Sequence, residues 1–223
     1  MWHEYSEPQP CIEALTHAIV SHVQSRLQQA GTYTLALSGG RSPIPLFECL
    51  AQADLPWALM RLRLVDERYV PPNHPDSNER LVRQHLLSGA ATAADFRALY
   101  QESASIEQAV NAANQDAGPI DLAILGMGDD GHMASLFPGA AQLPAALADN
   151  APPYLHVTPP QAPHERISLS LPALRACGHL LLYIAGAHKK KVLRSAESKP
   201  DRDLPISLLA AEPGGLPDVY WHP

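Results

Sequence analysis

Residues 121–132 read DLAILGMGDDGH, and this stretch decides the fold class. Its first half, residues 121–126, is a short apolar run, which is typical of a strand buried on both faces of a sheet. Its second half, residues 126–132, is rich in glycine, so we expect a sharp turn where the strand ends. The stretch therefore predicts a strand of a parallel sheet whose carboxyl end presents Asp130 and His132.

Similar strands and helical patterns alternate on both sides of this stretch. We expect further strands at residues 33–38, 61–66, 179–186 and 219–221. Helical spacing and helix-start signals predict helices over residues 11–29, from 42–43, from 77–78 to about 87, over 105–116 and from 189–191, and a brief one ending at 138–139. Strands that alternate with helices form a mostly parallel sheet covered on both faces. We therefore expect an α/β protein, a three-layer α/β/α domain that spans residues 1–223.

The composition excludes several classes of protein. Hydrophobic residues make up 46% and charged residues 17% of the chain, so it can bury a core and is not wholly disordered. The formal net charge of −7 argues against a nucleic-acid partner. The 3 cysteines form no CxxC pair, which argues against a disulfide scaffold. The N-terminal residues are polar, and no apolar run approaches the roughly 18 residues that span a membrane, so we expect a cytoplasmic protein.

Unusual residues follow three of the expected strands. These residues are SGGRS (38–42), DER (66–68) and GMGDDGH (126–132). The carboxyl ends of parallel strands meet at one edge of the sheet, where ligands bind in such folds. We therefore expect the three segments to converge on one cleft, even if any one of them alone has no function.

The first segment has the features of an anion site. Gly39 and Gly40 allow a sharp turn and a close approach to a ligand. Ser42 suits the N-cap of the following helix and Pro43 its first residue. The free N–H groups of such a helix start bind anions, and Arg41 adds a positive charge. An ordinary strand-to-helix turn is the alternative, and the GK[ST] ending of a Walker loop is missing.

Charged residues elsewhere add candidates for the same anion. Arg68 can hold a phosphate with two parallel hydrogen bonds, while Asp66 either orients Arg68 or meets a substrate hydroxyl. Arg166 opens the segment RISLSL, and Lys189 stands in GAHK at the start of a helix. For each of these side chains, the alternative is an ordinary solvated surface charge.

The third segment matches GxGxxG, but we reject a dinucleotide site. That fingerprint follows the first strand of its unit and needs an acidic residue at a strand end about 20 positions later, which is missing. Instead, the glycines turn the chain so that Asp130 and His132 point into the cleft, and His is well suited to proton transfer near neutral pH. No GxSxG, HExxH or Cys/His cluster is present, so neither a serine nucleophile nor a metal is indicated.

Together these motifs resemble the 6-phosphogluconolactonases, within the superfamily that includes the glucosamine-6-phosphate deaminases. The resemblance runs from about residue 10 to the C-terminus and rests on SGGRSP (38–43), VDERYVP (65–71), PDSN (75–78), GMGDDGHMASLFPG (126–139), RISLSLPAL (166–174) and GAHK (186–189). The deaminases typically read FNEP where this chain has SLFP (135–138), and DEY where it has DER. Both differences favour the lactonase. Ser42 stands where Thr is frequent, and Arg175 where the lactonases often have Asn.

The resemblance implies a modified Rossmann-like sheet and hydrolysis of 6-phospho-D-glucono-1,5-lactone to 6-phosphogluconate, in the oxidative pentose phosphate pathway, without a metal or organic cofactor. His132 would be the general base, and Asp130 would orient His132 or a substrate hydroxyl. The expected contacts of the substrate and its phosphate are Gly39, Gly40, Arg41, Ser42, Asp66, Arg68, Arg166 and Lys189. A 6-phosphosugar isomerase or deaminase and a non-catalytic sugar-phosphate sensor stay open as alternatives. Monomer and dimer also stay open.

Overall fold

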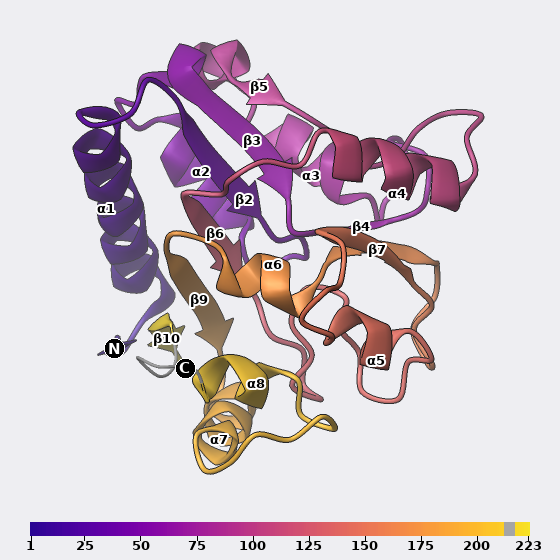
Figure 1. Ribbon diagram of the computed structural model, residues 1–223. Helices are drawn as coiled ribbons and strands as arrows, with labels where there is room; N and C mark the ends of the chain where they lie inside the picture. Colours follow the sequence, from indigo (N-terminus) through magenta and orange to yellow (C-terminus); the bar gives the residue numbers. More distant parts are fainter. Residues whose placement is uncertain (212–216) are drawn as a thin grey trace.

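A computed structural model describes residues 1–211 and 217–223 (Figure 1). The strands are β1 (Trp2–Glu4), β2 (Tyr33–Leu37), β3 (Met60–Leu64), β4 (Asp66–Arg68), β5 (Asp95–Phe96), β6 (Leu122–Leu125), β7 (Tyr154–Val157), β8 (Arg166–Leu169), β9 (Leu180–Ala185) and β10 (Asp218–His222). The helices are α1 (Pro8–Leu27), α2 (Ile44–Ala51), α3 (Asn78–His85), α4 (Ile106–Gln115), α5 (Leu143–Ala146), α6 (Leu171–Arg175), α7 (Ala187–Ala196) and α8 (Ile206–Ala210), with 3-10 turns at Trp57–Leu59 and Gly89–Ala93.

The central sheet has seven strands in the order β1-β10-β9-β6-β2-β3-β5. Every neighbouring pair in it is parallel. The apolar strand predicted at residues 121–126 is β6, whose four residues are all buried between β9 and β2. The expected α/β sandwich is confirmed, and the strand ends that carry the motifs are neighbours in the sheet.

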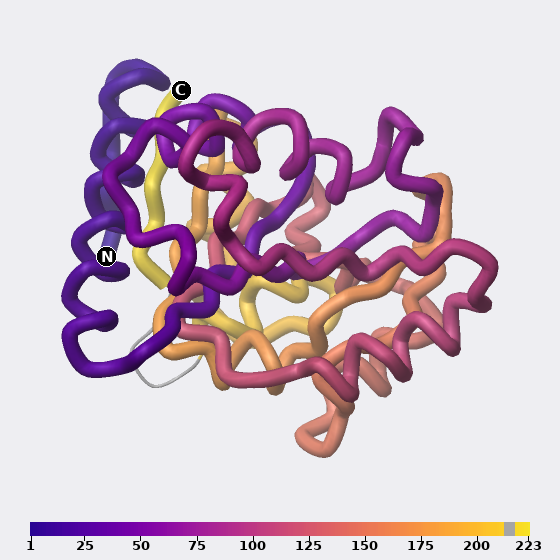
Figure 2. Tube along the Cα trace, turned by 90° about the horizontal axis from the view of Figure 1, so that it is seen from above, coloured from indigo at the N-terminus to yellow at the C-terminus, as the bar shows by residue number. Residues whose placement is uncertain are grey.

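Helices cover the two faces of this sheet, as the alternation of side chains along β2 shows. Tyr33 faces α1, where its hydroxyl lies 2.6 Å from Nδ1 of His22. Thr34 faces the other way, into a cavity that α6 and α4 also line. Figure 2 shows α1 at one side of the molecule and α4 at the other. Among the described residues, no helix combines the length and the apolar character that crossing a membrane requires.

A second, three-stranded antiparallel sheet, in the order β4-β8-β7, was not predicted. DER is therefore not a loop entry but the strand β4, in which Arg68 pairs with Arg166 of β8. Two hydrogen bonds join this sheet to the end of β3: the N–H of Leu169 donates to the carbonyl of Val65 at 2.8 Å, and the Tyr154 hydroxyl donates to the carbonyl of Leu64 at 2.9 Å. The small sheet is thus held at the edge where the motifs converge.

Two local predictions about helices were wrong. Helix α2 begins at Ile44 with Pro43 at its N-cap, and the Ser42 hydroxyl makes no capping bond because it lies in the turn before the helix. No helix follows the glycine turn. Instead, an isolated bridge joins Met133 to Leu136, and Ala134 between them has a φ of 49°, which a right-handed helix does not accommodate.

Candidate active site

A cavity of about 280 Å³ lies at the carboxyl ends of β2, β6 and β9. Most of the predicted site residues line it: Gly39, Gly40, Arg41, Ser42, Asp66, Arg68, His132 and Lys189. Asp130 and Arg166 do not line it, but each lies beside a residue that does. The predicted convergence of the three motif segments on one cleft is therefore confirmed.

His132 and Asp130 form a hydrogen-bonded pair within the glycine turn. Nδ1 of His132 lies 2.6 Å from Oδ1 of Asp130, which also accepts the His132 backbone N–H at 3.1 Å. An ionised carboxylate only accepts, so Nδ1 carries the proton and Nε2 of the neutral ring keeps a lone pair. Partial burial raises the pKa of Asp130, but the N–H donors of His132, and its positive charge once the ring is protonated, lower it below its ordinary value. Asp130 is thus a stable anion beside the ring.

The imidazole ring of His132 occupies space that is free only because residue 128 is glycine. A Cβ at this position would lie 2.1 Å from Nδ1 of His132 and 2.7 Å from Oδ1 of Asp130. On its other side the ring contacts Phe137, with the ring centroids 4.3 Å apart. The backbone N–H of Gly128 donates to the carbonyl of His132 at 2.9 Å, which closes the turn. The turn therefore fixes the ring by close packing, and only glycine fits at residue 128.

The β2–α2 loop lies against the start of α3 for a similar reason. A Cβ on Gly39 would lie 1.7 Å from Oδ1 of Asn78, so only glycine allows this contact. Oδ1 of Asn78 and Oγ of Ser38 are both buried, yet neither has a hydrogen-bond partner among the described residues. Both residues line the cavity. Unpaired buried polar atoms cost free energy, so their gathering here indicates a site that a polar ligand completes.

Two arginines face each other across the antiparallel pair β4 and β8. Arg68 and Arg166 are direct partners in the register, so their side chains share one face. Arg166 is 5% exposed, and its Nε and Nη1 have no hydrogen-bond partner among the described residues. Burial and the charge of Arg68 lower the pKa of Arg166 to about 10. Two like charges placed opposite each other destabilise a sheet, and an anion between them would remove that cost.

Asp66 does not orient Arg68, which corrects one of the two roles considered for it. Its Oδ2 accepts a hydrogen bond from the Ser135 hydroxyl at 2.6 Å. Arg68 instead donates from Nη1 to the backbone carbonyl of Asp76 at 2.7 Å. Ser135 follows the glycine turn, so the Asp66–Ser135 bond joins two of the three motif segments. Contact of Asp66 with a substrate hydroxyl stays a prediction.

Lys189 stands apart from the other two lysines of its run. It lines the cavity from the first turn of α7, whereas Nζ of Lys190 lies 2.6 Å from Oε2 of Glu4 and over the ring of Trp221. Lys191 is exposed. Only one lysine of the three therefore reaches the site.

A histidine–aspartate group lies beside Arg68, whose Nη1 donates to the backbone carbonyl of Asp76. Single ligand atoms of His74, Asp76 and His164 all lie within 4.8 Å of one another. The sequence contains no signal for this group because the loops that contribute it are far apart in the chain. The three residue types suit a divalent transition metal, although Nε2 of His164 already donates a hydrogen bond to Oδ2 of Asp76 at 3.1 Å.

Comparisons with known proteins agree with this geometry. Residues 6–221 match the family model described as "Glucosamine-6-phosphate isomerases/6-phosphogluconolactonase". The chain belongs to this family. It is 39% identical to the 6-phosphogluconolactonase of Neisseria meningitidis serogroup A, over 99% of this chain and 98% of that protein, and 37% identical to that of Pseudomonas putida, over 99% and 92%. The chain is also similar to the crystal structure of a 6-phosphogluconolactonase from Shewanella baltica. The match covers all of this chain and 97% of that chain, with a TM-score of 0.92 and 32% identity.

The sequence analysis missed the buried carboxylate of Glu67. Glu67 is 0% exposed and accepts four hydrogen bonds, from the backbone N–H groups of Arg68, Asn78 and Glu79 at 2.7–2.8 Å and from the Ser77 hydroxyl at 3.2 Å. It thereby caps the first turn of α3 and fixes β4 against it. Burial raises the pKa of Glu67 to about 7, although the three backbone donors lower it.

We expect Glu67 to make stability depend on pH. Its pKa is raised from 4.5 to about 7, so the folded chain holds a proton that the unfolded chain has released between these values. The stabilisation by this group is therefore complete below about pH 4.5 and is lost as the pH rises through about 7. Relative to Glu67→Gln, the free energy of unfolding of the wild type should fall by about 3 kcal/mol from about pH 4.5 to about pH 8.

Urea denaturation of both proteins across this pH range measures the difference. The matched control is Glu102→Gln, because Glu102 is exposed. Its stability should follow that of the wild type at every pH. A difference between wild type and Glu67→Gln that does not change with pH would contradict the expectation.

Proposed function

We propose that the chain hydrolyses 6-phospho-D-glucono-1,5-lactone to 6-phosphogluconate, the reaction named for its curated relatives, and that residues 1–223 act as one catalytic unit. One observation carries the proposal. The buried guanidinium of Arg166 is incompletely paired and lies opposite that of Arg68. At the same cleft, Nε2 of His132 is available to accept a proton. The first feature suits a phosphate and the second suits a general base.

The phosphate end of the substrate would lie at Arg68 and Arg166. A phosphate dianion between the two guanidiniums neutralises their repulsion and supplies acceptors for the unpartnered Nε and Nη1 of Arg166. Lys189 adds a third positive charge from α7. The backbone N–H groups of Gly39 and Gly40, with Arg41 and the Ser42 hydroxyl, line the same cavity and would contribute further donors.

The lactone end would lie at His132. Nε2 takes a proton from a water molecule as the water oxygen attacks C1, and the carbonyl electron pair moves onto the carbonyl oxygen. The tetrahedral intermediate then collapses, the bond from C1 to the ring oxygen breaks, and His132 returns its proton to that oxygen. Asp130 holds the ring in the required tautomer and stabilises the imidazolium that forms. A positioned base of this kind contributes roughly 10²–10⁴-fold to the rate.

Hydrolysis of freshly prepared lactone, measured above its spontaneous opening, tests the proposal. We expect the wild type to accelerate the reaction and His132→Ala to lower kcat about 10²–10⁴-fold, with a much smaller change in KM. The control is His17→Ala, since His17 is exposed on α1, far along the chain from every motif segment. It should match the wild type.

Two outcomes would count against the proposal. A folded wild type without any acceleration, or one that releases ammonia from glucosamine 6-phosphate, would replace the lactonase by the sensor or the deaminase. Near-wild-type turnover in His132→Ala would remove His132 from the chemistry while leaving the activity in place.

The position of the ring can be tested without altering either member of the pair. In Gly128→Ala the new Cβ takes the space of the imidazole, so we expect kcat to fall about 100-fold or more. The matched variant is Gly126→Ala in the same turn, where a Cβ would meet no atom within 4 Å. Its kcat should change at most a few-fold. Equal kinetics for the two variants would show that close packing at Gly128 does not position His132.

A further inference from the structure

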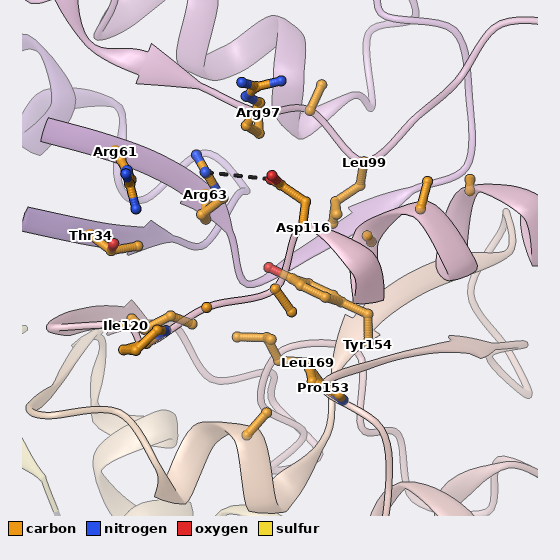
Figure 3. Close-up of a pocket in the computed structure, with 18 of the residues that line it drawn as sticks. Thr34, Arg61, Arg63, Arg97, Leu99, Asp116, Ile120, Pro153, Tyr154 and Leu169 are labelled. Carbon is orange, nitrogen blue, oxygen red and sulfur yellow. Dashed lines mark ion pairs between the residues drawn. The ribbon is translucent and has the colours of Figure 1, made fainter.

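A second and larger cavity, of about 370 Å³, lies on the face of the sheet that α4 and α6 cover (Figure 3). We propose that it binds a small organic anion, a carboxylate or phosphate attached to an apolar body of one or two rings. Thr34 of β2 and Ile120, just before β6, line it, so it lies toward the amino ends of these strands. No residue of the lactonase site lines it. The proposal therefore does not depend on the proposed function.

Strand β3 supplies the first argument. A strand inside a parallel sheet is normally apolar on both faces, because helices cover both. β3 reads MRLRL instead, and it buries Met60, Leu62 and Leu64 while Arg61 and Arg63 point to the opposite face. It lies between β2 and β5, not at the edge of the sheet. Arg61 is exposed, but the side chain of Arg63 is only 15% exposed, so Arg63 is costly to place on this face unless something polar meets it.

The pairing of Arg63 is incomplete. Its side chain is 15% exposed, and its Nη2 lies 3.5 Å from Asp95 and 3.4 Å from Asp116. Charge-assisted hydrogen bonds between guanidinium and carboxylate are shorter, about 2.7–2.9 Å. The two carboxylates are themselves about half exposed. Nη1 of Arg63 donates to the backbone carbonyls of Leu62 and Asp95 at 3.0 and 3.2 Å, but these acceptors are uncharged. The positive charge of Arg63 is therefore neutralised only loosely, by the two distant carboxylates.

The cavity also has an excess of positive charge. Arg97 donates from Nε to the same Asp95 carboxylate at 3.0 Å, so one carboxylate serves two arginines. Arg61 has no ion pair among the residues that the structure describes. Three guanidiniums thus gather at one end of the cavity against Asp95 and Asp116, as Figure 3 shows for all but Asp95. On a chain with a net charge of −7, this local excess points to an anionic ligand.

Most of the remaining lining is apolar, with Thr34 and Gln101 as the polar exceptions. Ile120, Tyr154 and Leu169 lie on the side of the cavity opposite Arg97, and Leu99 lies beside Asp116 (Figure 3). Helix α4 turns Ala109, Ala112 and Ala113 toward the space, and these share one face because they are three and four residues apart. Small side chains on the inner face of a helix leave room where larger ones would fill the core. The volume lies in the range of small-molecule sites, about 300–1,000 Å³.

The charged group and the apolar body of the ligand would therefore occupy different parts of this cavity. The oxyanion would lie between Arg61 and Arg63, and the ring would pack on Tyr154 and Leu169 beside the alanine face of α4. A purely polar sugar phosphate does not match the apolar wall, which distinguishes this ligand from the substrate of the other cleft.

Fluorescence titration with 1-anilinonaphthalene-8-sulfonate, an aromatic oxyanion, tests the proposal on the full chain. We expect saturable binding at one site in the wild type. Binding should be about tenfold or more weaker in Arg63→Met, which removes the charge, and in Ala112→Phe, which fills the space. N-Phenyl-1-naphthylamine, the same molecule without the sulfonate, should bind wild type and Arg63→Met equally. Arg202→Met, an exposed arginine elsewhere, is the control and should bind the probe as the wild type does.

Thermal melting first establishes that each variant is folded. If Arg63→Met does not fold, Ala112→Phe still tests the proposal. Excess 6-phosphogluconate should leave the bound probe in place, because it would occupy the other cleft. Displacement by 6-phosphogluconate, no saturable binding, or wild-type affinity in both Arg63→Met and Ala112→Phe would each overturn the proposal.

Discussion

The buried carboxylate of Glu67 holds the end of the sheet and the start of α3 in one fixed arrangement, and the cleft depends on it. Its four hydrogen bonds satisfy N–H groups that the first turn of a helix otherwise leaves unpaired. Asp66 and Arg68, the chain neighbours of Glu67, are held in place with it. Asn78, whose backbone N–H donates to the same carboxylate, lies so close to Gly39 that no side chain fits at residue 39. Glu67 thus fixes β4 against the start of α3 and, through Asn78, against the β2–α2 loop.

Several features of the cleft lower the stability of the folded chain while suiting it to bind a ligand. Arg68 and Arg166 repel each other across β4 and β8, and polar atoms of Ser38, Asn78 and Arg166 are buried without partners among the described residues. Each of these features destabilises the folded chain when nothing is bound. A phosphate dianion would remove the repulsion between the arginines and pair with Nε and Nη1 of Arg166, because it supplies negative charge and several acceptor atoms at one point. Oδ1 of Asn78 needs a donor instead, which a substrate hydroxyl would supply. Binding of the substrate then stabilises the fold as well as positioning the lactone.

Part of this arrangement could be predicted from the sequence. Apolar strands that end in glycine turns predicted the parallel sheet and its binding edge. Orientation of His132 by Asp130 was one of two roles expected for Asp130, the other being contact with a substrate hydroxyl. The second sheet could not be predicted, since β4 has only three residues and no recognisable alternation. Glu67 was missed because, within DER, it is indistinguishable from a surface charge. The two arginines of β3 were counted as part of an apolar strand, although their alternation with Leu was the signal for a polar face.

A crystal structure of the complex with 6-phosphogluconate tests the central claim most directly. The account predicts phosphate oxygens about 3 Å from the guanidinium nitrogens of both Arg68 and Arg166, and the C1 carboxylate within about 3 Å of Nε2 of His132. One molecule would then span the two ends of the cleft. A phosphate at His132, or a ligand that leaves Nε and Nη1 of Arg166 unpaired, would contradict the account.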